Sequence, residues 1–338
     1  MKESVDNIKP LGFQWEALDP FLFCVHHEDF FPKGNANLGP DKKELAGRNM
    51  GQDFQVKDGW RMYHGQKVPG FPTHPHRGFE TVTVVRKGWV DHSDSMGAAG
   101  RYGNGDVQWM TAGKGVQHAE MFPLINQDRE NTMELFQIWL NLPRAGKFVE
   151  PHYKMFWNDD IPIYEAADAQ NRKTKIELIA GKIDTLSAPA PPPDSWAAKI
   201  ENEVAIWVIH MEPNVTFELP VASPGVNRRL YFYKGDQLHL NKTKLLAYHS
   251  ADLKADSQVN IIAGEETCSA LILQGRPMNE PVVQYGPFVM NTRQEIQEAY
   301  SEYQQTQFGG WPWPQYEVTH GTDAKRFALY SDGKREER

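Results

Sequence analysis

The stretch that decides the fold reads Gly70-Phe71-Pro72-Thr73-His74-Pro75-His76-Arg77-Gly78-Phe79-Glu80. Side chains two residues apart in a β-strand point to the same side. His74 and His76 therefore present two imidazoles to one space, about 7 Å apart along the backbone. Two imidazoles placed in this way can chelate a metal ion. The run at 79–85 that follows is rich in β-branched residues and predicts a further strand.

A second pair with the same spacing closes the stretch at 105–120, which reads Gly-Asp-Val-Gln-Trp-Met-Thr-Ala-Gly-Lys-Gly-Val-Gln-His-Ala-Glu. His118 and Glu120 are again two residues apart, so neighbouring strands could bring three imidazoles and one carboxylate to one site. A single His-x-His pair is more often an ordinary surface or core pair. Two such pairs, each with glycine-rich turns before it and strand patterns around it, indicate a metal site.

Glu80 is the alternative to Glu120 as the fourth ligand. It has the same strand parity as His74 and His76, but it lies four residues beyond His76, about 13 Å along a straight strand. It would need a bend at Gly78 to reach the same ion. Glu120 needs only a neighbouring strand. The geometry favours Glu120 and leaves Glu80 open.

The composition limits the metal chemistry and the partners. Among 338 residues there are twelve histidines but only two cysteines, Cys24 and Cys268, which lie far apart. This excludes a disulfide framework and a cysteine-rich zinc site, so a metal must use nitrogen and oxygen ligands, and both cysteines are predicted to be buried small apolar side chains. The net charge of −8 argues against a nucleic-acid groove. We expect no direct nucleic-acid binding.

Hydrophobicity predicts where the protein resides. No apolar window approaches the length of a transmembrane helix, and the residues at 1–6 lack the apolar stretch of a secretory signal. We therefore expect no membrane contact and a cytoplasmic location. A nuclear location stays open if the source organism has a nucleus, and the sequence does not fix the oligomeric state.

Strand-like runs fill both halves of the chain. One face of the run at 135–142 carries Phe136, Ile138, Leu140 and Leu142. At about 150 residues per domain, the length suggests two domains. We place the boundary near Pro151 to Pro162 and predict domains at 1–155 and 156–338. Further strands of the second domain are predicted at 176–180, 204–210, 230–233, 259–262 and 270–274.

Two segments depart from the strand pattern. A helix is predicted at 292–308, because Thr292 and Glu295 fit a capping box and Gly309 supplies a stop. The stretch at 33–70 carries seven glycines and little periodic hydrophobicity. It is predicted to be a long surface insertion in the first domain.

The two ligand segments resemble the paired motifs of the cupin superfamily. In fuller form the chain resembles the pirin family, over a span from about Asp19 to Pro312. The resemblance implies an all-β bicupin: two cupin (jelly-roll-type) β-barrel domains packed face to face, here followed by the C-terminal helix. The segments that carry the likeness are 74–83, 91–97, 105–120, 140–143, 280–292 and 308–312.

The resemblance also assigns the ligands. It implies a single metal, usually iron, in the N-terminal domain, and a C-terminal domain without metal. Glu80 is left with a role beside the site or in the pocket wall. The stretch at 33–70 is longer than the connection that the family usually has, so we expect it to cover or reshape the mouth of the first barrel. The metal ligands carried over are His74, His76, His118 and Glu120.

Three imidazoles and one carboxylate leave two positions open on an octahedral ion, where dioxygen or a chelating substrate can bind. We expect one divalent metal. Availability favours iron, and manganese, nickel, copper, cobalt or zinc would fit the same ligands. Neutral histidines are required, so metal binding should weaken as the pH falls through their titration range.

The resemblance implies two alternative functions. In the first, which we favour, the protein is a non-haem iron dioxygenase of the quercetin 2,3-dioxygenase type, which cleaves flavonols with dioxygen. Glu120, or a nearby carboxylate, is then the catalytic proton acceptor. In the second, it is an iron-dependent, redox-sensing regulator that binds transcription factors or metabolic enzymes. The ligand motif does not separate them. Residues at such positions are more often ordinary barrel core, but the pocket candidates for a flat aromatic substrate are Phe79, Trp109, Met110, Phe136 and Trp139.

Overall fold

The structure, a computed structural model, describes residues 4–338 and divides into two compact units. The first unit consists of residues 26–158 and 280–338, and the second unit consists of residues 4–25 and 159–279. The predicted domains, 1–155 and 156–338, therefore differ from the units at both ends of the chain. The N-terminal residues join the second unit because β1 (Val5–Pro10) pairs with β21 (His249–Leu253).

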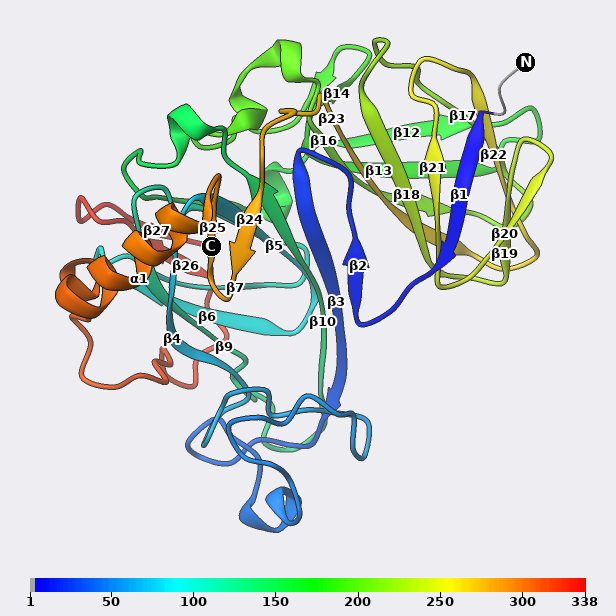
Figure 1. The fold of residues 1–338 in the computed structure, drawn as a ribbon. Helices are drawn as coiled ribbons and strands as arrows, with labels where there is room; N and C mark the ends of the chain where they lie inside the picture. The colour runs from blue at the N-terminus through cyan, green and yellow to red at the C-terminus, as the bar shows by residue number, and fades with distance from the viewer. Residues whose placement is uncertain (1–3) are drawn as a thin grey trace. The chain divides into compact units, whose positions relative to one another are not determined.

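The strands of the first unit belong to two six-stranded sheets and a two-stranded hairpin at Val283–Met290. Within the second of them, β4, β9 and β6 are neighbours (Figure 1). The first sheet has the order β11 (His152–Phe156), β8 (Val107–Thr111), β5 (Phe79–Lys87), β10 (Asn131–Asn141), β3 (Phe21–Phe31), β2 (Gln14–Glu16). The second has the order β27 (Arg335–Glu337), β26 (Phe327–Leu329), β7 (Ala99–Gly103), β6 (Trp89–Asp94), β9 (Val116–Met121), β4 (Gly70–His76).

The strands predicted around the ligand segments are confirmed. The run at 79–85 lies within β5 and is buried throughout, as expected for a β-branched strand in a core. Gly78 separates β4 from β5 with φ of +85°, and a Cβ there would lie 2.0 Å from the carbonyl oxygen of Val289. Only glycine can make this turn. The predicted strand at 135–142 corresponds to β10, which ends one residue earlier, at Asn141.

The predicted helix is also confirmed, but it belongs to the first unit and not to the C-terminal domain. α1 (Arg293–Thr306) begins with the complete Thr292–Glu295 capping box. It packs beside the hairpin of β24 (Val283–Tyr285) and β25 (Phe288–Met290) in Figure 1. Tyr303 on α1 donates a hydrogen bond to Gln117 on β9, at 3.0 Å. These contacts tie the helix to the strand that carries His118.

A seven-stranded sheet, a four-stranded sheet and a hairpin make up the second unit. Four of its five predicted strands fall within observed ones, and the fifth, at 204–210, begins one residue before the observed strand Ala205–Met211. The seven-stranded sheet has the order β1, β21, β18 (Asn227–Lys234), β23 (Cys268–Gly275), β16 (Ala205–Met211), β13 (Lys173–Ala180), β12 (Ile163–Ala167). The four-stranded sheet has the order β17 (Thr216–Leu219), β22 (Val259–Ala263), β19 (Gln237–Leu240), β20 (Thr243–Leu246). The hairpin pairs β14 (Lys182–Ile183) with β15 (Leu186–Ser187). β2 (Gln14–Glu16) pairs with the first part of β3.

The insertion at 33–70 has mostly irregular backbone, as predicted, with one 3-10 turn at Lys42–Leu45. It extends beyond the ends of β3 and β10 in Figure 1. It is more than a surface loop, because Trp60, Met62 and Tyr63 pack into a core of the first unit. Across residues 4–338, the structure contains no helix with the length and apolar character needed to cross a membrane.

Candidate metal centre

Three histidines converge inside the first unit. β4 and β9 are antiparallel neighbours, and their register places His74 directly opposite His118. His76 lies two residues further along the same face of β4. One ring nitrogen from each of the three lies within 4.8 Å of the others. The structure thus brings together His74, His76 and His118 as the paired spacing predicted.

Backbone carbonyls orient two of the three rings. His74 Nδ1 lies 2.9 Å from the carbonyl oxygen of Pro72, and His76 Nδ1 lies 3.4 Å from that of Pro287. A carbonyl oxygen only accepts, so each Nδ1 carries the proton and each Nε2 presents a lone pair. This is the tautomer that a metal-binding histidine needs when Nε2 is the ligand atom.

His118 gives the clearest indication that the cluster suits a metal. Its side chain is fully buried, and neither of its ring nitrogens has a hydrogen-bond partner within residues 4–338. Buried polar nitrogens normally have a partner, so an unsatisfied pair calls for an explanation. A bound cation would satisfy one of them. The three-histidine donor set therefore fits a divalent metal ion.

Burial also keeps the cluster neutral. Desolvation lowers the pKa of His74 to about 4, and it moves the pKa values of His76 and His118 well below their ordinary range. The mutual repulsion of the neighbouring rings adds to the same shift. At neutral pH all three rings are in the unprotonated form that binds a metal.

Glu120 lies beside this cluster. Its Oε2 is 3.8 Å from Nε2 of His118. Thr83 donates a hydrogen bond to Oε1 and Gln137 donates one to Oε2, both at 2.9 Å. Burial raises the pKa of Glu120, while these donors oppose the rise. The carboxylate is thus held at the edge of the cluster, and its predicted role as a metal ligand stays a prediction.

Glu80 lies in a different environment. It sits on β5, opposite Thr111 on β8. Its Oε1 accepts hydrogen bonds from Trp109 at 3.2 Å and from Thr111 at 2.7 Å. The break between β4 and β5 at Gly78 separates it from the strand of His74 and His76. Glu80 therefore supports the wall formed by β8 and is not a member of the three-histidine cluster.

His92 is a neighbour of the site that the spacing did not single out. It lies opposite Glu120 in the β6–β9 register, and its ring centroid is 5.6 Å from that of His118. One of its ring nitrogens lies 3.1 Å from the amide nitrogen of Gln108 and the other lies 3.2 Å from a carboxylate oxygen of Asp94. The His92–Asp94 spacing repeats the two-residue pattern and could have indicated that both face the barrel interior.

The predicted pocket residues separate into two groups. Phe79 and Trp139 stack with their ring centroids 4.0 Å apart, and each lies near the ring of His76, at 5.0 and 5.3 Å. Trp109 instead bonds Glu80. The remaining candidates, Met110 and Phe136, are fully buried in other packing. Trp139, which is half-buried, is the best placed of the five to meet a substrate.

The C-terminal segment closes one side of the site. Arg77, next to His76, forms a 2.7 Å ion pair with Glu302 on α1. A Cβ at Gly115 would lie 2.7 Å from the ring of Phe308, so the helix end is in close contact with the turn before β9. These contacts hold residues from Glu280 onward against the ligand strands.

The C-terminal segment also forms hydrogen bonds with the insertion at 33–70. The Glu317 carboxylate accepts hydrogen bonds from the backbone N–H groups of Gln66, Lys67 and Val68, at 2.8 to 3.2 Å. The adjoining His64 lies near Phe71, whose ring centroid is 6.3 Å from that of His74. The insertion therefore ends beside the histidine cluster, and its expected effect on the mouth of this barrel stays a prediction.

Together these observations define the class of protein: an all-β chain of two cupin domains with a candidate metal centre in the first unit. The Pirin family model matches residues 14–140, and the model described as the pirin C-terminal cupin domain matches residues 206–309. The chain belongs to the pirin family.

Relatives agree with this assignment. A protein of Vibrio cholerae that carries the provisional name quercetin 2,3-dioxygenase is 35% identical over 240 residues, which cover 70% of this chain and 79% of the relative. The protein called Pirin-1 of Arabidopsis thaliana is 33% identical over 255 residues, covering 71% and 78%. The crystal structure of a quercetin 2,3-dioxygenase from Acinetobacter baumannii matches with a TM-score of 0.68 and 27% identity, over 91% of this chain and 96% of that one.

Proposed function

We propose that this pirin-family protein is an iron-dependent dioxygenase of the quercetin 2,3-dioxygenase type. The observation that carries the proposal is the convergence of three neutral imidazoles, two of them buried, whose ligand nitrogens lie within 4.8 Å of one another. The names of the Vibrio cholerae relative and of the Acinetobacter baumannii structure support it. The substrate class is a flat, flavonol-like aromatic, and the co-substrate is dioxygen.

In this proposal His74, His76, His118 and Glu120 hold one metal. Bound iron would supply open positions for dioxygen and for the oxygens of a chelating substrate. The histidines contribute neutral donors whose orientation is fixed by the carbonyl oxygens of Pro72 and Pro287. The fold itself buries the histidine rings and keeps them neutral. The site therefore needs little reorganisation to bind a cation.

Glu120 is the proposed proton acceptor. A carboxylate whose pKa is raised by burial is a stronger base than an exposed one, and burial acts on Glu120 in this direction. Thr83 and Gln137 fix both oxygens, which keeps the carboxylate facing the cluster. In this position the carboxylate of Glu120 takes the proton of the substrate hydroxyl group.

The exposure of the side chains indicates the direction of substrate approach. His74, Gln137 and Trp139 are partly exposed, whereas His118 is 0% and Glu120 is 4% exposed. The indole of Trp139, backed by the stacked ring of Phe79, offers an aromatic face next to His76. A flat aromatic substrate would stack on this face and present its oxygens to the histidine cluster.

The test is an assay of the purified protein loaded separately with iron, manganese, nickel, copper, cobalt and zinc. Each form is incubated with quercetin in air, and the loss of flavonol absorbance is followed together with oxygen uptake. The proposal expects metal-dependent loss of quercetin with matching oxygen consumption. No turnover with any of the six metals would contradict it.

A second candidate function has support from a specific observation. The ligand strands connect to a surface element, because Arg77 beside His76 pairs with Glu302, whose side chain is 50% exposed on α1. A change of charge at a bound metal could alter this surface and its binding of a protein partner. The regulatory candidate expects protein binding that depends on the oxidation state of the metal, without quercetin turnover.

A further inference from the structure

One of the three clustered histidines lacks a hydrogen bond that could fix its ring. Backbone carbonyl oxygens orient His74 and His76, whereas both ring nitrogens of His118 are enclosed without a partner within residues 4–338. A metal-binding histidine almost always donates its second ring N–H to a neighbouring group, which fixes the orientation of the ring. The orientation of His118 must therefore come from packing and from the position of β9, the strand that carries it.

Gln117, the residue before His118, joins β9 to the C-terminal helix. Its side chain lies on the opposite face of the strand from His118, and the residue is 3% exposed. Its Oε1 accepts a hydrogen bond from the hydroxyl group of Tyr303 on α1 at 3.0 Å, and its Nε2 donates one to the carbonyl oxygen of Gln307 at 2.7 Å. Both polar groups of the amide are thus bound to the end of one helix.

The four residues at 307–310 that follow α1 form a hook against the same strand. All four have positive φ, and the values for Gln307 and Phe308 are +51° and +47°, in the left-handed region that residues other than glycine rarely adopt. The ring of Phe308 packs against Gly115, two residues before Gln117, where a Cβ would lie 2.7 Å from a ring carbon. Unfavourable backbone conformations persist where surrounding contacts enforce them, and they are concentrated at functional sites.

The C-terminal segment supports His76 as well. The carbonyl oxygen of Pro287 lies 3.4 Å from Nδ1 of His76, and the backbone N–H of Val289 donates a hydrogen bond to the carbonyl oxygen of Arg77 at 3.0 Å. Arg77 also pairs with Glu302 on α1. The β24–β25 hairpin and α1 together thus contact both strands that carry the histidines.

We propose that Gln117 is a positioning residue for His118: it fixes β9 to Tyr303 and to the hook, and so sets the place of the His118 ring at the metal. This inference rests on the proposed metal centre and does not depend on the dioxygenase reaction. The groups of a binding site must be held within about 0.5 Å of the productive geometry. A looser attachment of β9 therefore weakens metal binding and changes the coordination geometry, although Gln117 does not touch the metal.

The test uses Co²⁺ as the probe, because its visible absorption reports both the amount of bound metal and the coordination geometry. Co²⁺ is titrated into the metal-free full chain. Gln117→Leu keeps a similar volume and removes both hydrogen bonds to the C-terminal segment. It should bind Co²⁺ about 10- to 100-fold more weakly, the loss typical of a group that supports a metal ligand. At saturating Co²⁺ its absorption bands should differ from those of the wild type.

A milder variant removes only one of the two hydrogen bonds. Tyr303→Phe keeps the ring and its packing, so the variant should fold. It should bind Co²⁺ about fivefold more weakly, the scale of one neutral hydrogen bond. Because Tyr303 acts through Gln117, the double variant should lose no more affinity than Gln117→Leu alone.

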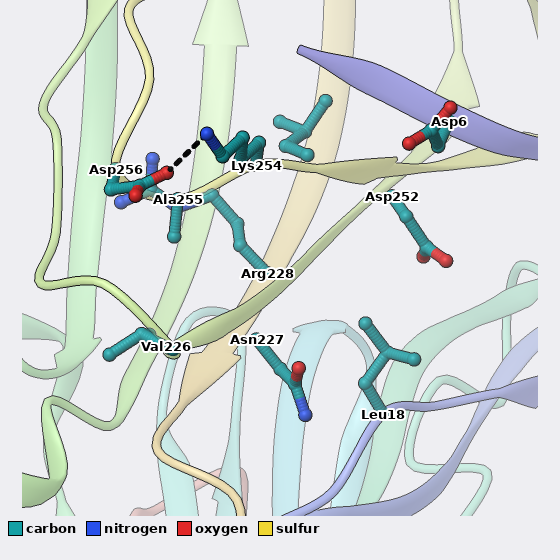
Figure 2. A pocket seen from close by; sticks show the side chains of 11 residues that line it. Asp6, Leu18, Val226, Asn227, Arg228, Asp252, Lys254, Ala255 and Asp256 are labelled. Atoms are coloured by element: carbon teal, nitrogen blue, oxygen red, sulfur yellow. Dashed lines mark ion pairs between the residues drawn. The ribbon is translucent and has the colours of Figure 1, made fainter. Parts of the chain in front are cut away.

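Two controls match these changes. Tyr300→Phe removes a hydroxyl group of the same helix, which donates a hydrogen bond to the carbonyl oxygen of Tyr285 and not to β9. Asn227→Leu removes a partly buried amide of the second unit, which donates to the carbonyl oxygen of Asp19 at 2.7 Å. Figure 2 shows Asn227 among the residues that line a cavity of that unit. Both controls should have the Co²⁺ affinity and absorption of the wild type.

Four results would count against the proposal. Wild-type affinity and absorption in both Gln117→Leu and Tyr303→Phe would overturn the positioning role and leave the metal centre in place. An equal loss of affinity in Asn227→Leu would assign the effect to general stability and would overturn it too. Additive losses in the double variant would contradict the attachment through Tyr303. If the wild type binds no Co²⁺, the metal centre itself is contradicted, and the positioning role is overturned with it.

Discussion

His74 on β4 lies directly opposite His118 on β9, with ring centroids 4.5 Å apart. Two strands that are far apart in sequence thus place two imidazoles next to each other, with their ring planes tilted by 54°. His76 completes the group from the same strand as His74. This pairing turns two short sequence motifs into one site.

Burial of the histidines makes the stability of the metal-free protein depend on pH. The ordinary pKa of histidine is about 6.5 in an unfolded chain, whereas that of His74 is lowered to about 4 in the fold. Between these values His74 binds more protons in the unfolded chain than in the fold, so its contribution makes stability fall as the pH falls from 6.5 to about 4, and this contribution levels off below. His27, with a pKa lowered to about 3, acts in the same direction.

Urea unfolding with a chelator present, measured at pH 7 and pH 5, checks this dependence. The midpoint should be lower at pH 5. In His74→Gln the fall between the two pH values should be smaller, since one of the shifted groups is gone. An equal fall in the two proteins would contradict the assignment of His74 as a source of the dependence.

Gln137 is predicted to position Glu120. Its Nε2 donates to Oε2 of Glu120 at 2.9 Å, so Gln137→Leu removes one of the groups that stabilise the carboxylate. Loss of a group that orients a metal ligand typically costs about 10- to 100-fold in metal affinity. Metal titration of Gln137→Leu should show a loss of this size, while Gln170→Leu on the surface should show none. An affinity within about twofold of the wild type would exclude a positioning role.

Trp139 is predicted to bind the substrate and not the metal. Trp139→Ala removes the aromatic face beside His76. The value of kcat/KM for quercetin should fall by about tenfold, the scale of a lost aromatic contact, with the metal content unchanged. Tyr285→Ala, which alters an aromatic ring that is 68% exposed, serves as the control. Unchanged kcat/KM in Trp139→Ala would place the substrate elsewhere.

Glu317 is predicted to hold the insertion over the site. Glu317→Gln removes the negative charge that accepts hydrogen bonds from three backbone N–H groups of the insertion. The attachment of the insertion should weaken by about 1–3 kcal/mol. Protease cleavage within 33–70 and removal of metal by a chelator should both become faster. Glu298→Gln on α1 should change neither rate. If both rates stay at the wild-type value in Glu317→Gln, the insertion does not shield the metal.

The parts of the fold that depend on local sequence could be predicted. The two-residue spacing of His74 and His76 placed both rings on one face, and Thr292 with Glu295 marked the start of α1. Both features are decided by neighbours within a few residues. The strand at 79–85 is likewise decided by its own β-branched residues.

Features that depend on distant contacts could not be predicted. Nothing near α1 in the sequence indicates that it joins the first unit, because that depends on contacts such as Tyr303 with Gln117. Thr83 and Gln137 meet at Glu120 only because β5 and β10 pair in one particular register. His92 likewise becomes a neighbour of Glu120 through the β6–β9 register.

The most direct test of the metal centre is the metal content of the purified protein and of His76→Ala, measured by elemental analysis. The wild type should carry about one metal ion per chain, and the variant should lose more than about 100-fold in metal affinity, since loss of a ligand exceeds loss of a group that only supports one. His239→Ala, a histidine of β19 in the second unit, should keep its metal. Equal metal content in the wild type and His76→Ala would contradict the assignment of the site.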